Sequence, residues 1–225
     1  MTELEAIYAR HSVRRYTGRP ICGETEEQLR QEIDRCNEKS GLKIQLITDE
    51  PEAFGSILAH YGLFKGVRNY IAIVGRESEE LAEKAGYYGE RIVLKAQMLG
   101  LNTCWVAATY SKRKSRIAVA EGEKVVCVIA VGYGATQGRP HRNRPMKSLC
   151  RVEREPAPDW FYRGVEAAML APTAVNRQQF CFTWAGDGVT ARATAGGLAL
   201  LDLGIVKYHF EIGVGREGFC WNAEE

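Results

Sequence analysis

The sequence predicts an α+β protein in which helices cover a sheet. Two observations support this fold class. Residues 70–75 and 124–131 are continuous apolar runs, which are typical of strands buried on both faces. Residues 78–99 place apolar side chains at helical spacing, and this is the longest such pattern in the chain. Because such strands need cover on both sides, we expect the helices to pack on the sheet.

The first part of the chain alternates helical and strand patterns. Thr2 is placed to cap the first helix, and Thr25 with Gln28 forms a capping-box pattern at the second. Gly100 follows the longest helical pattern as a C-terminal cap. In chain order, the predicted elements are helix 2–8, helix 26–38, strand 42–48, helix 51–61, strand 70–75, helix 78–99, strand 101–107, a basic helix or turn at 111–120, strand 124–131 and an irregular loop at 132–147.

A similar order of elements starts again after residues 153–159, where Pro156 and Pro158 predict an extended connector. The elements predicted there are helix 160–170, polar loop 171–178, strand 180–184 and a helix 195–202 that ends at Leu203-Gly204-Ile205, as the earlier long helix ends at Leu99-Gly100-Leu101. We interpret this as an internal duplication. Its first half is 1–152, its shortened second half is 153–225, and the two form one compact unit.

Composition argues against several classes of function. Lys and Arg number 30 against 28 Asp and Glu, so a net charge of +2 predicts neither a nucleic-acid nor a membrane partner. The chain start lacks the apolar core of a signal peptide, and no run has the length of a membrane-spanning helix, so we expect a cytoplasmic protein. Seven cysteines, four histidines and no CxxC pair argue against a disulfide framework and against a metal site.

A basic segment follows the first predicted helix. In an extended chain, the side chains of Arg10, Ser12 and Arg14 project to one side, because side-chain direction alternates. Two guanidinium groups flanking a hydroxyl suit a phosphate, and each charge-assisted hydrogen bond stabilises binding by about 1.5–3 kcal/mol. The alternative interpretation is a solvated basic turn.

The loop at 171–178 presents several hydrogen-bonding groups between two apolar blocks. It is short and anchored at both ends, which suits a platform for a ligand; the alternative is an ordinary helix-to-strand turn. The first half of the chain has the Arg-Ser-Arg segment but only a trimmed loop of this kind. The second half has the full loop but no Arg-Ser-Arg segment.

Four blocks of sequence together resemble the FMN-dependent nitroreductase family. RHSVR at 10–14 is similar to its Arg-x-Ser-x-Arg/Lys phosphate motif, and APTAVNRQ at 171–178 to its Ala-Pro-Ser-x-x-Asn-x-Gln loop beside the flavin. LGLNTCWV at 99–106 is similar to its Leu-Gly-Leu-Gly-x-Cys-Trp-Ile segment, and VGY at 131–133 with the later Arg142 and Arg144 to the end of its core. The resemblance implies a nitroreductase-like fold, with a central, mostly antiparallel sheet flanked by helices.

The order of these motifs departs from that of the family. Members are usually homodimers in which one subunit supplies the phosphate motif and the other supplies the Pro-Ser loop. Here both stand in one chain, so the sequence resembles a fused, monomeric pseudo-dimer, as in the single-chain "putative TM nitroreductase" branch. The complementary losses then predict one complete flavin site per chain.

The resemblance implies a role for each residue that matches a motif. Those that would hold the FMN phosphate are Arg10, Ser12, Arg142 and Arg144. Arg14 would lie near the pyrimidine edge of the ring, where its charge stabilises reduced flavin, and His11 would add backbone or stacking contacts. The residues that would line the ring and ribityl chain are Pro172, Thr173, Ala174 and Asn176, and Gln178 of the same loop is also expected to bind the cofactor.

Some positions depart from the family pattern. Ala107 or Ala108 stands where the family offers a backbone N–H to flavin N5, and members often have Gly there. Gln179 replaces the usual Pro and Phe180 the usual Trp, so the exit of the loop differs.

The implied activity is hydride transfer from NADH or NADPH, bound transiently, through FMN to a small electron acceptor such as a nitroaromatic or a quinone. The cofactor carries the chemistry, so no catalytic side chain is expected. Cys104 and Trp105 are interpreted as structural residues. The sequence has no GxGxxG fingerprint, so we do not expect a dinucleotide-binding fold. Two alternatives stay open: an FMN-binding protein without turnover (a flavin carrier, sensor or partner-binding module), and an anion- or nucleic-acid-binding module using residues 139–147.

Overall fold

The structure, a computed structural model, describes residues 1–55, 63–215 and 219–222. Its contacts divide the chain into two compact units. The first comprises Met1, Ala9–Leu81 and Ile92–Pro140, and the second comprises Thr2–Tyr8, Ala82–Arg91 and His141–Glu225. Helix α4 (Leu81–Met98) therefore contributes residues to both. The duplication into halves 1–152 and 153–225 stays a prediction.

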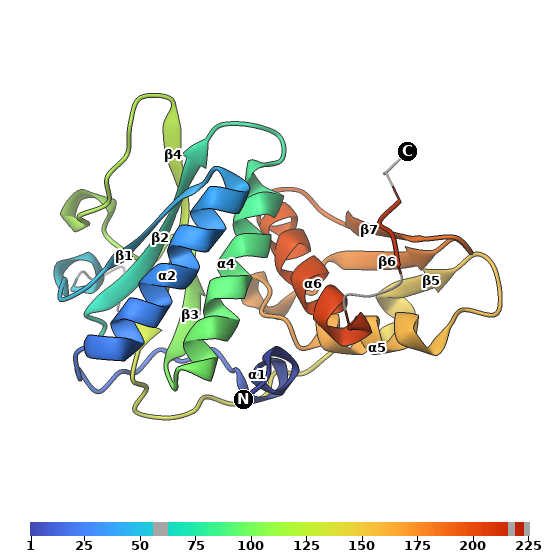
Figure 1. Cartoon of the computed structure of the whole chain (residues 1–225), viewed down its shortest axis with the longest axis horizontal. Coiled ribbons are helices and arrows are strands. Elements are labelled where there is room, and N and C mark those ends of the chain that lie inside the picture. Colours follow the sequence, from blue (N-terminus) through green and yellow to red (C-terminus); the bar gives the residue numbers. More distant parts are fainter. Residues whose placement is uncertain (56–62, 216–218, 223–225) are drawn as a thin grey trace. The chain divides into compact units, whose positions relative to one another are not determined.

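The first unit is built on a four-stranded antiparallel sheet with the strand order β1-β2-β4-β3 (Figure 1). Ile129 in the central strand β4 pairs with Ile71 of β2 and with Trp105 of β3. The bounds confirm the four strands predicted for this part of the chain: β1 (Lys43–Ile47), β2 (Asn69–Arg76), β3 (Asn102–Val106) and β4 (Glu123–Gly132).

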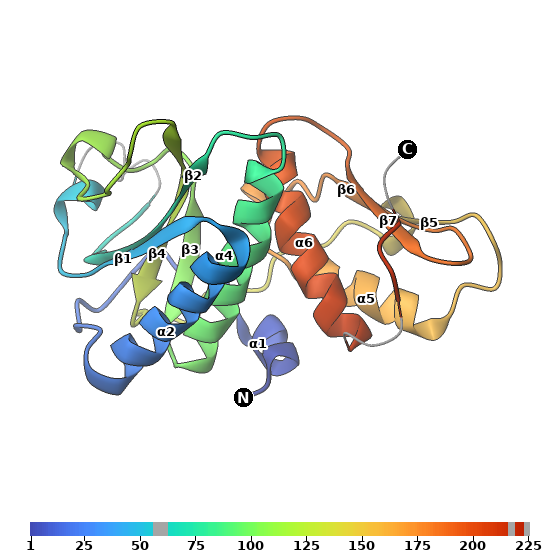
Figure 2. The ribbon, with the colours of Figure 1, turned by 45° about the horizontal axis from the view of Figure 1, so that its top comes forward.

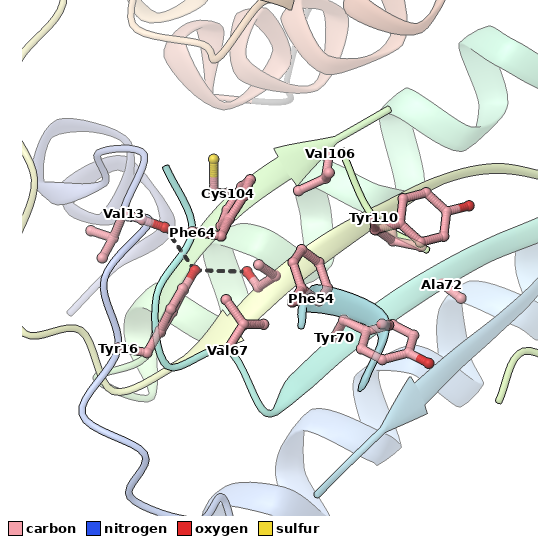
Figure 3. Close-up of a cluster of buried hydrophobic side chains, with 13 residues drawn as sticks. Val13, Tyr16, Phe54, Phe64, Val67, Tyr70, Ala72, Cys104, Val106 and Tyr110 are labelled. Atoms are coloured by element: carbon pink, nitrogen blue, oxygen red, sulfur yellow. Dashed lines mark hydrogen bonds between the residues drawn. The ribbon is translucent and has the colours of Figure 1, made fainter. Parts of the chain in front are cut away.

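Both faces of this sheet are covered, as the continuous apolar runs predicted, and β2 is buried from Asn69 to Gly75. Helix α2 (Gly23–Ser40) and the part of α4 that belongs to this unit lie across one face (Figures 1 and 2). An aromatic cluster covers the other face (Figure 3). The ring of Phe54 lies 5.3 Å from that of Phe64 and 5.9 Å from that of Tyr70. The sheet is therefore a rigid support for the segments at its edges.

The helix ends follow the predicted signals in part. Thr2 caps α1 (Glu3–Ala9), because its hydroxyl accepts the N–H of Glu5 at 3.2 Å and the Glu5 carboxylate accepts the N–H of Thr2 at 2.8 Å. Gly100 adopts φ 77° just after α4 and donates its N–H to the last turn, as predicted. The predicted cap at Thr25 is wrong. Helix α2 begins earlier, at Gly23, so Thr25 lies inside the first turn and no side chain caps the helix.

The remaining predicted elements of this unit are short. The predicted helix 51–61 is described only at η1 (Glu52–Phe54), and residues 56–61 lie outside the described part of the chain. The basic segment at 111–120 forms one turn, η2 (Lys112–Lys114). The Gly- and Arg-rich loop is irregular as predicted, up to η3 (Met146–Ser148).

The second unit combines a three-stranded sheet with helices. Helix α5 (Asp159–Met169) and strand β6 (Phe180–Trp184) confirm the predictions for 160–170 and 180–184. Strand β5 (Cys150–Val152) runs parallel to β6, and β7 (Val189–Ala193) runs antiparallel to it. The sequence did not predict β5 or β7, because both are short and lack a clear apolar pattern.

The helix end predicted at Leu203-Gly204-Ile205 is wrong. Helix α6 (Leu198–Val214) continues through Gly204 and packs against α5. A Cβ at Gly204 would lie 1.8 Å from the carbonyl oxygen of Glu83, and one at Gly86 would lie 2.0 Å from that of Leu201. Gly204 therefore allows α6 to cross the first half of α4 at close range. One of the repeats that suggested a duplication thus has a different physical cause.

Candidate functional site

The basic segment is held extended beside the edge strand of the first sheet. The N–H of Val13 donates to the carbonyl of Thr103 at 3.0 Å, and Ser12 forms a parallel bridge with Thr103. Three residues later, the N–H of Tyr16 donates to the carbonyl of Lys65 at 2.9 Å. The Tyr16 hydroxyl donates to the carbonyl of Val13 at 2.8 Å (Figure 3). These bonds fix the backbone from which the basic side chains project.

Arg10, Ser12 and Arg14 all act on the thiol of Cys104. Burial raises the pKa of Cys104, while the charges of Arg14 and Arg10 and a hydrogen bond from Ser12 oppose that rise. All three residues thus influence one thiol, which places them in the neighbourhood of Cys104, while the common direction of their side chains stays a prediction. The raised pKa keeps Cys104 protonated, in line with its interpretation as a structural thiol.

The other predicted residues of the first unit are placed differently. Arg10 is buried and Arg14 is exposed, so the segment runs from the interior toward the surface. His11 is half-buried between them. Ala107 and Ala108 follow β3 directly and are exposed in an irregular bend, where a ligand can approach their backbone.

Asn102 is a residue of this region that sequence reasoning missed. Its side chain is 3% exposed, its Oδ1 accepts the N–H of Gly134 at 3.0 Å, and its Nδ2 donates to Oε1 of Gln137 at 3.0 Å. Asn102 therefore anchors the start of the Gly- and Arg-rich loop. A signal was present, because Asn102 stands where the family motif has Gly.

In the second unit, Gln178 joins two segments that are distant in sequence. Its Oε1 accepts the backbone N–H of Arg144 at 2.6 Å, and its Nε2 donates to the carbonyl of Met169 at 3.0 Å and to Oδ1 of Asn143 at 3.3 Å. The Arg144 guanidinium in turn donates to the carbonyl of Gln178 at 3.1 Å. Gln178 is fully buried. Both ends of its amide are thus bonded within the protein, and it positions Arg144.

Asn176 makes the matching contact to the other predicted arginine. Its Nδ2 donates to the carbonyl of Arg142 at 2.7 Å, and both residues are exposed. The Thr173 hydroxyl accepts the N–H of Gln178 at 3.1 Å, which closes the loop on itself. We call residues 141–144 and 172–178 the loop cluster. The structure brings together within it the predicted residues Arg142, Arg144, Pro172, Thr173, Ala174, Asn176 and Gln178.

The loop cluster contains backbone strain. Val175, Asn176 and Gln178 have φ angles of 45°, 56° and 48°, in the left-handed region that disfavours side chains. Val175 is the most costly of the three, because it is β-branched, and its side chain is 84% exposed. Strain of this kind persists only where surrounding contacts fix it, and it gathers at functional sites.

Asp202, on α6, is a second residue that sequence reasoning missed. Its two carboxylate oxygens accept the N–H of Ala174 at 3.1 and 3.0 Å. Asp202 is 3% exposed, and burial raises its pKa to about 6 even though the Ala174 N–H acts to lower it. A lone acid within the apolar run LALLDLGIV was the available signal.

All seven cysteines are free thiols. Within the ranges that the structure describes, no group of three or more His, Cys, Asp or Glu side chains could hold a metal ion. Over the same ranges, no helix combines the length and apolar character that crossing a bilayer requires.

The antiparallel sheet flanked by helices is the arrangement found in proteins of the nitroreductase class. The chain matches the model of the family described as "Putative TM nitroreductase" over residues 3–214. Because this match spans nearly the whole chain, the chain belongs to that family. The resemblance inferred from the four sequence blocks is confirmed, and so is the α+β fold with an antiparallel sheet flanked by helices.

Solved structures support the assignment. A "putative nitroreductase" from Thermotoga maritima is 26% identical, with a TM-score of 0.66 over 96% of this chain and 85% of that chain. A "putative nitroreductase in complex with FMN" from Desulfovibrio desulfuricans is 21% identical, with a TM-score of 0.53 over 70% of this chain and 99% of that one. A nitroreductase family protein from Streptococcus pneumoniae is 15% identical, with a TM-score of 0.53 over 66% and 98%. The last two support the fold alone. No curated protein matches the chain.

Proposed function

We propose that the chain is an FMN-dependent oxidoreductase that transfers hydride from NADH or NADPH to a small electron acceptor, such as a nitroaromatic or a quinone. The observation that carries this proposal is the fixed extended backbone beside β3, from which Arg10, Ser12 and Arg14 all influence the Cys104 thiol. Membership of the nitroreductase family supports it, as does the presence of FMN in the Desulfovibrio structure. The proposed reaction would take place in the cytoplasm, where these donors are supplied.

The donor groups of the basic segment fit the phosphate of FMN. Arg10 and Arg14 offer guanidinium groups, and Ser12 between them offers a hydroxyl. Arginine binds phosphate with two parallel hydrogen bonds, so its orientation decides its value as a ligand. The backbone bonds to Thr103 and Lys65 restrict where this segment can move. We therefore propose that it binds the phosphate, with Arg14 toward the pyrimidine edge of the ring.

The loop cluster would supply Arg142 and Arg144 to the phosphate and its other residues to the remaining parts of the cofactor. Arg142 and Arg144 are exposed basic residues, and Asn176 and Gln178 hold their backbone. The flanking residues Pro172, Thr173 and Ala174 are small, so a flat ring can approach the backbone closely. The complementary distribution of motifs in the sequence supports the proposal that both groups serve one FMN. The chain would then act as a single-chain pseudo-dimer.

When bound, FMN supplies the redox chemistry by accepting a hydride and passing the electrons to the acceptor. The chain's own residues bind and orient. The positive charge of Arg14 would stabilise negative charge on the reduced ring, and a backbone N–H of Ala107 or Ala108 would be offered to the ring as a hydrogen-bond donor. No side chain is proposed to act as a nucleophile, which agrees with the raised pKa of the Cys104 thiol.

Anaerobic stopped-flow mixing of the FMN-loaded protein with NADH or NADPH tests this function. We expect the visible absorbance of the bound flavin to bleach with at least one donor, much faster than that of free FMN. Bound flavin that bleaches with neither donor would contradict the proposal and favour an FMN-binding protein without turnover. Failure to bind FMN, with strongly salt-dependent binding of nucleic acid, would favour an anion-binding module.

A further inference from the structure

Asp202 has an unusual environment for a carboxyl group. Among the described residues, its only hydrogen-bond donor is the N–H of Ala174, which both oxygens share. A carboxylate can accept about four hydrogen bonds. Since Asp202 is almost wholly buried, water does not make up the difference. The group is therefore desolvated without full compensation, as its raised pKa also indicates.

A polar acceptor at this position of α6 costs desolvation that an apolar residue in the helix would avoid. Its acceptance of the Ala174 N–H is what sets it apart from its apolar neighbours. Buried acids in this state are typical of functional sites. The partner of Asp202, Ala174, is itself part of the loop cluster.

The bond holds one end of the strained loop. Ala174 begins η4 (Ala174–Asn176), and the left-handed residues Val175 and Asn176 follow at once. The other end of the loop is fixed by Gln178 through its bonds to Arg144. A strained segment keeps its conformation only while both ends are restrained, so loss of either restraint lets it relax.

We propose that Asp202 is a positioning residue, whose carboxyl holds Ala174 and thereby keeps residues 173–178 in the conformation that binds FMN. This inference rests on the proposed function for its ligand, but its effect on the loop is independent of FMN. Asp202 acts through the backbone of Ala174 and need not contact the cofactor. Because the Ala174 N–H is bonded to Asp202, it does not bond the cofactor, and Ala174 would contribute to FMN binding through its small size.

Two measurements on Asp202→Ala test the inference. The first is trypsin cleavage of the FMN-free protein after Arg177, which is exposed within the loop, relative to cleavage after Arg113, which is exposed in the other unit. We expect the ratio to rise about tenfold as the loop relaxes. The second is FMN affinity, which we expect to fall about tenfold. Asp202→Asn keeps an acceptor oxygen and should stay within about threefold of the wild type in both.

Glu50→Ala is the matched control. Glu50 is also buried, and its carboxylate accepts the backbone N–H groups of Glu52 at 2.8 Å and Ala53 at 3.2 Å in the first unit. Its loss should lower stability without changing FMN affinity or the Arg177 cleavage ratio. If Asp202→Ala does not fold, Ala174→Pro removes the same N–H from the other partner and should give the same two effects.

The outcomes separate this inference from the proposed function. If the wild-type protein does not bind FMN, the proposed FMN-dependent function is contradicted. The cleavage ratio would still test whether Asp202 restrains residues 173–178. An unchanged ratio in folded Asp202→Ala overturns the inference. So does a ratio that rises equally in Glu50→Ala, because the effect would then be general destabilisation. Wild-type FMN affinity in folded Asp202→Ala would also overturn it.

Discussion

The side chain of Gln178 accepts the backbone N–H of Arg144 at 2.6 Å, and the guanidinium of Arg144 donates back to the carbonyl of Gln178 at 3.1 Å. The two residues are 34 positions apart. This reciprocal pair ties the Gly- and Arg-rich loop to the Pro-Thr loop. Because each residue restrains the other, the fully buried Gln178 can govern what the exposed Arg144 binds.

Gln178→Ala should release Arg144. The change leaves the N–H of Arg144 without its acceptor, which costs about 1–3 kcal/mol of unfolding free energy. We also expect weaker FMN binding, measured by quenching of flavin fluorescence. Gln179→Ala is the matched control, since the hydrogen bond of Gln179 to Thr194 uses only its backbone carbonyl. Equal FMN affinity in the two variants would show that the side chain of Gln178 does not influence FMN binding.

Asn176 can be tested in two ways because its side chain and its backbone act separately. Asn176→Ala removes the bond to Arg142 and leaves a strained φ of 56°, whereas Asn176→Gly removes the bond and relieves the strain. If the bond positions Arg142, both should weaken FMN binding, by about 1 kcal/mol. Arg177→Ala, next in the exposed loop, should not. Normal binding by Asn176→Gly would mean that the side chain does not matter.

Arg10→Ala should weaken FMN retention by about 1.5–3 kcal/mol if Arg10 pairs with the phosphate. Arg15→Ala is the control, because alternation along the same segment predicts that Arg15 projects to the opposite side from Arg10 and Arg14. Equilibrium dialysis with FMN gives both affinities. An Arg10 variant that is folded and binds FMN as the wild type does would exclude Arg10 from the site.

The raised pKa of Asp202 predicts a pH dependence of stability. The native pKa is about 6, whereas an unfolded Asp titrates at about 3.9. Between these values the native state holds more protons, so the free energy of unfolding falls as pH rises, by about 3 kcal/mol in total. Asp202→Asn does not titrate. Urea unfolding from about pH 4 to about pH 7 should show the variant gaining stability relative to the wild type. A constant difference would contradict the shift.

Gly204 is predicted to be essential for helix packing. Gly204→Ala places a Cβ against the carbonyl of Glu83 and should lower the free energy of unfolding by about 3 kcal/mol. Gly196→Ala is the control, because an added Cβ there meets nothing within 4 Å, and it should change stability by less than about 0.5 kcal/mol. Similar urea midpoints for the two variants would show that the helices can separate at no cost.

The local elements of the fold were predictable from sequence. The strand at 180–184 matches β6 residue for residue, and the long helix ends where Gly100 predicts, because periodicity and capping depend on neighbours in the chain. Gly204 misled the prediction because its role depends on a carbonyl of another helix. No local pattern distinguishes a glycine that ends a helix from one that admits a neighbour.

In the candidate site, too, features that depend on chain neighbours were predictable from sequence, and contacts between distant residues were not. The common direction of Arg10, Ser12 and Arg14 follows from alternation along one segment, so the sequence predicts it. The role of Gln178 as a partner of Arg144 does not follow, and neither does the contact of Asp202 with Ala174, 28 residues away. Such contacts arise only when the chain folds. They concern the residues that position the site, whereas the residues proposed to bind the ligand stand in recognisable motifs.

The number of FMN molecules that each chain binds tests whether the chain has a single flavin site. The FMN-free protein is titrated with FMN, and bound flavin is compared with protein concentration. The complementary distribution of the Arg-Ser-Arg segment and the Pro-Thr loop predicts one FMN per chain. A ratio near two would contradict the single site, and absence of bound FMN would contradict the proposed function itself.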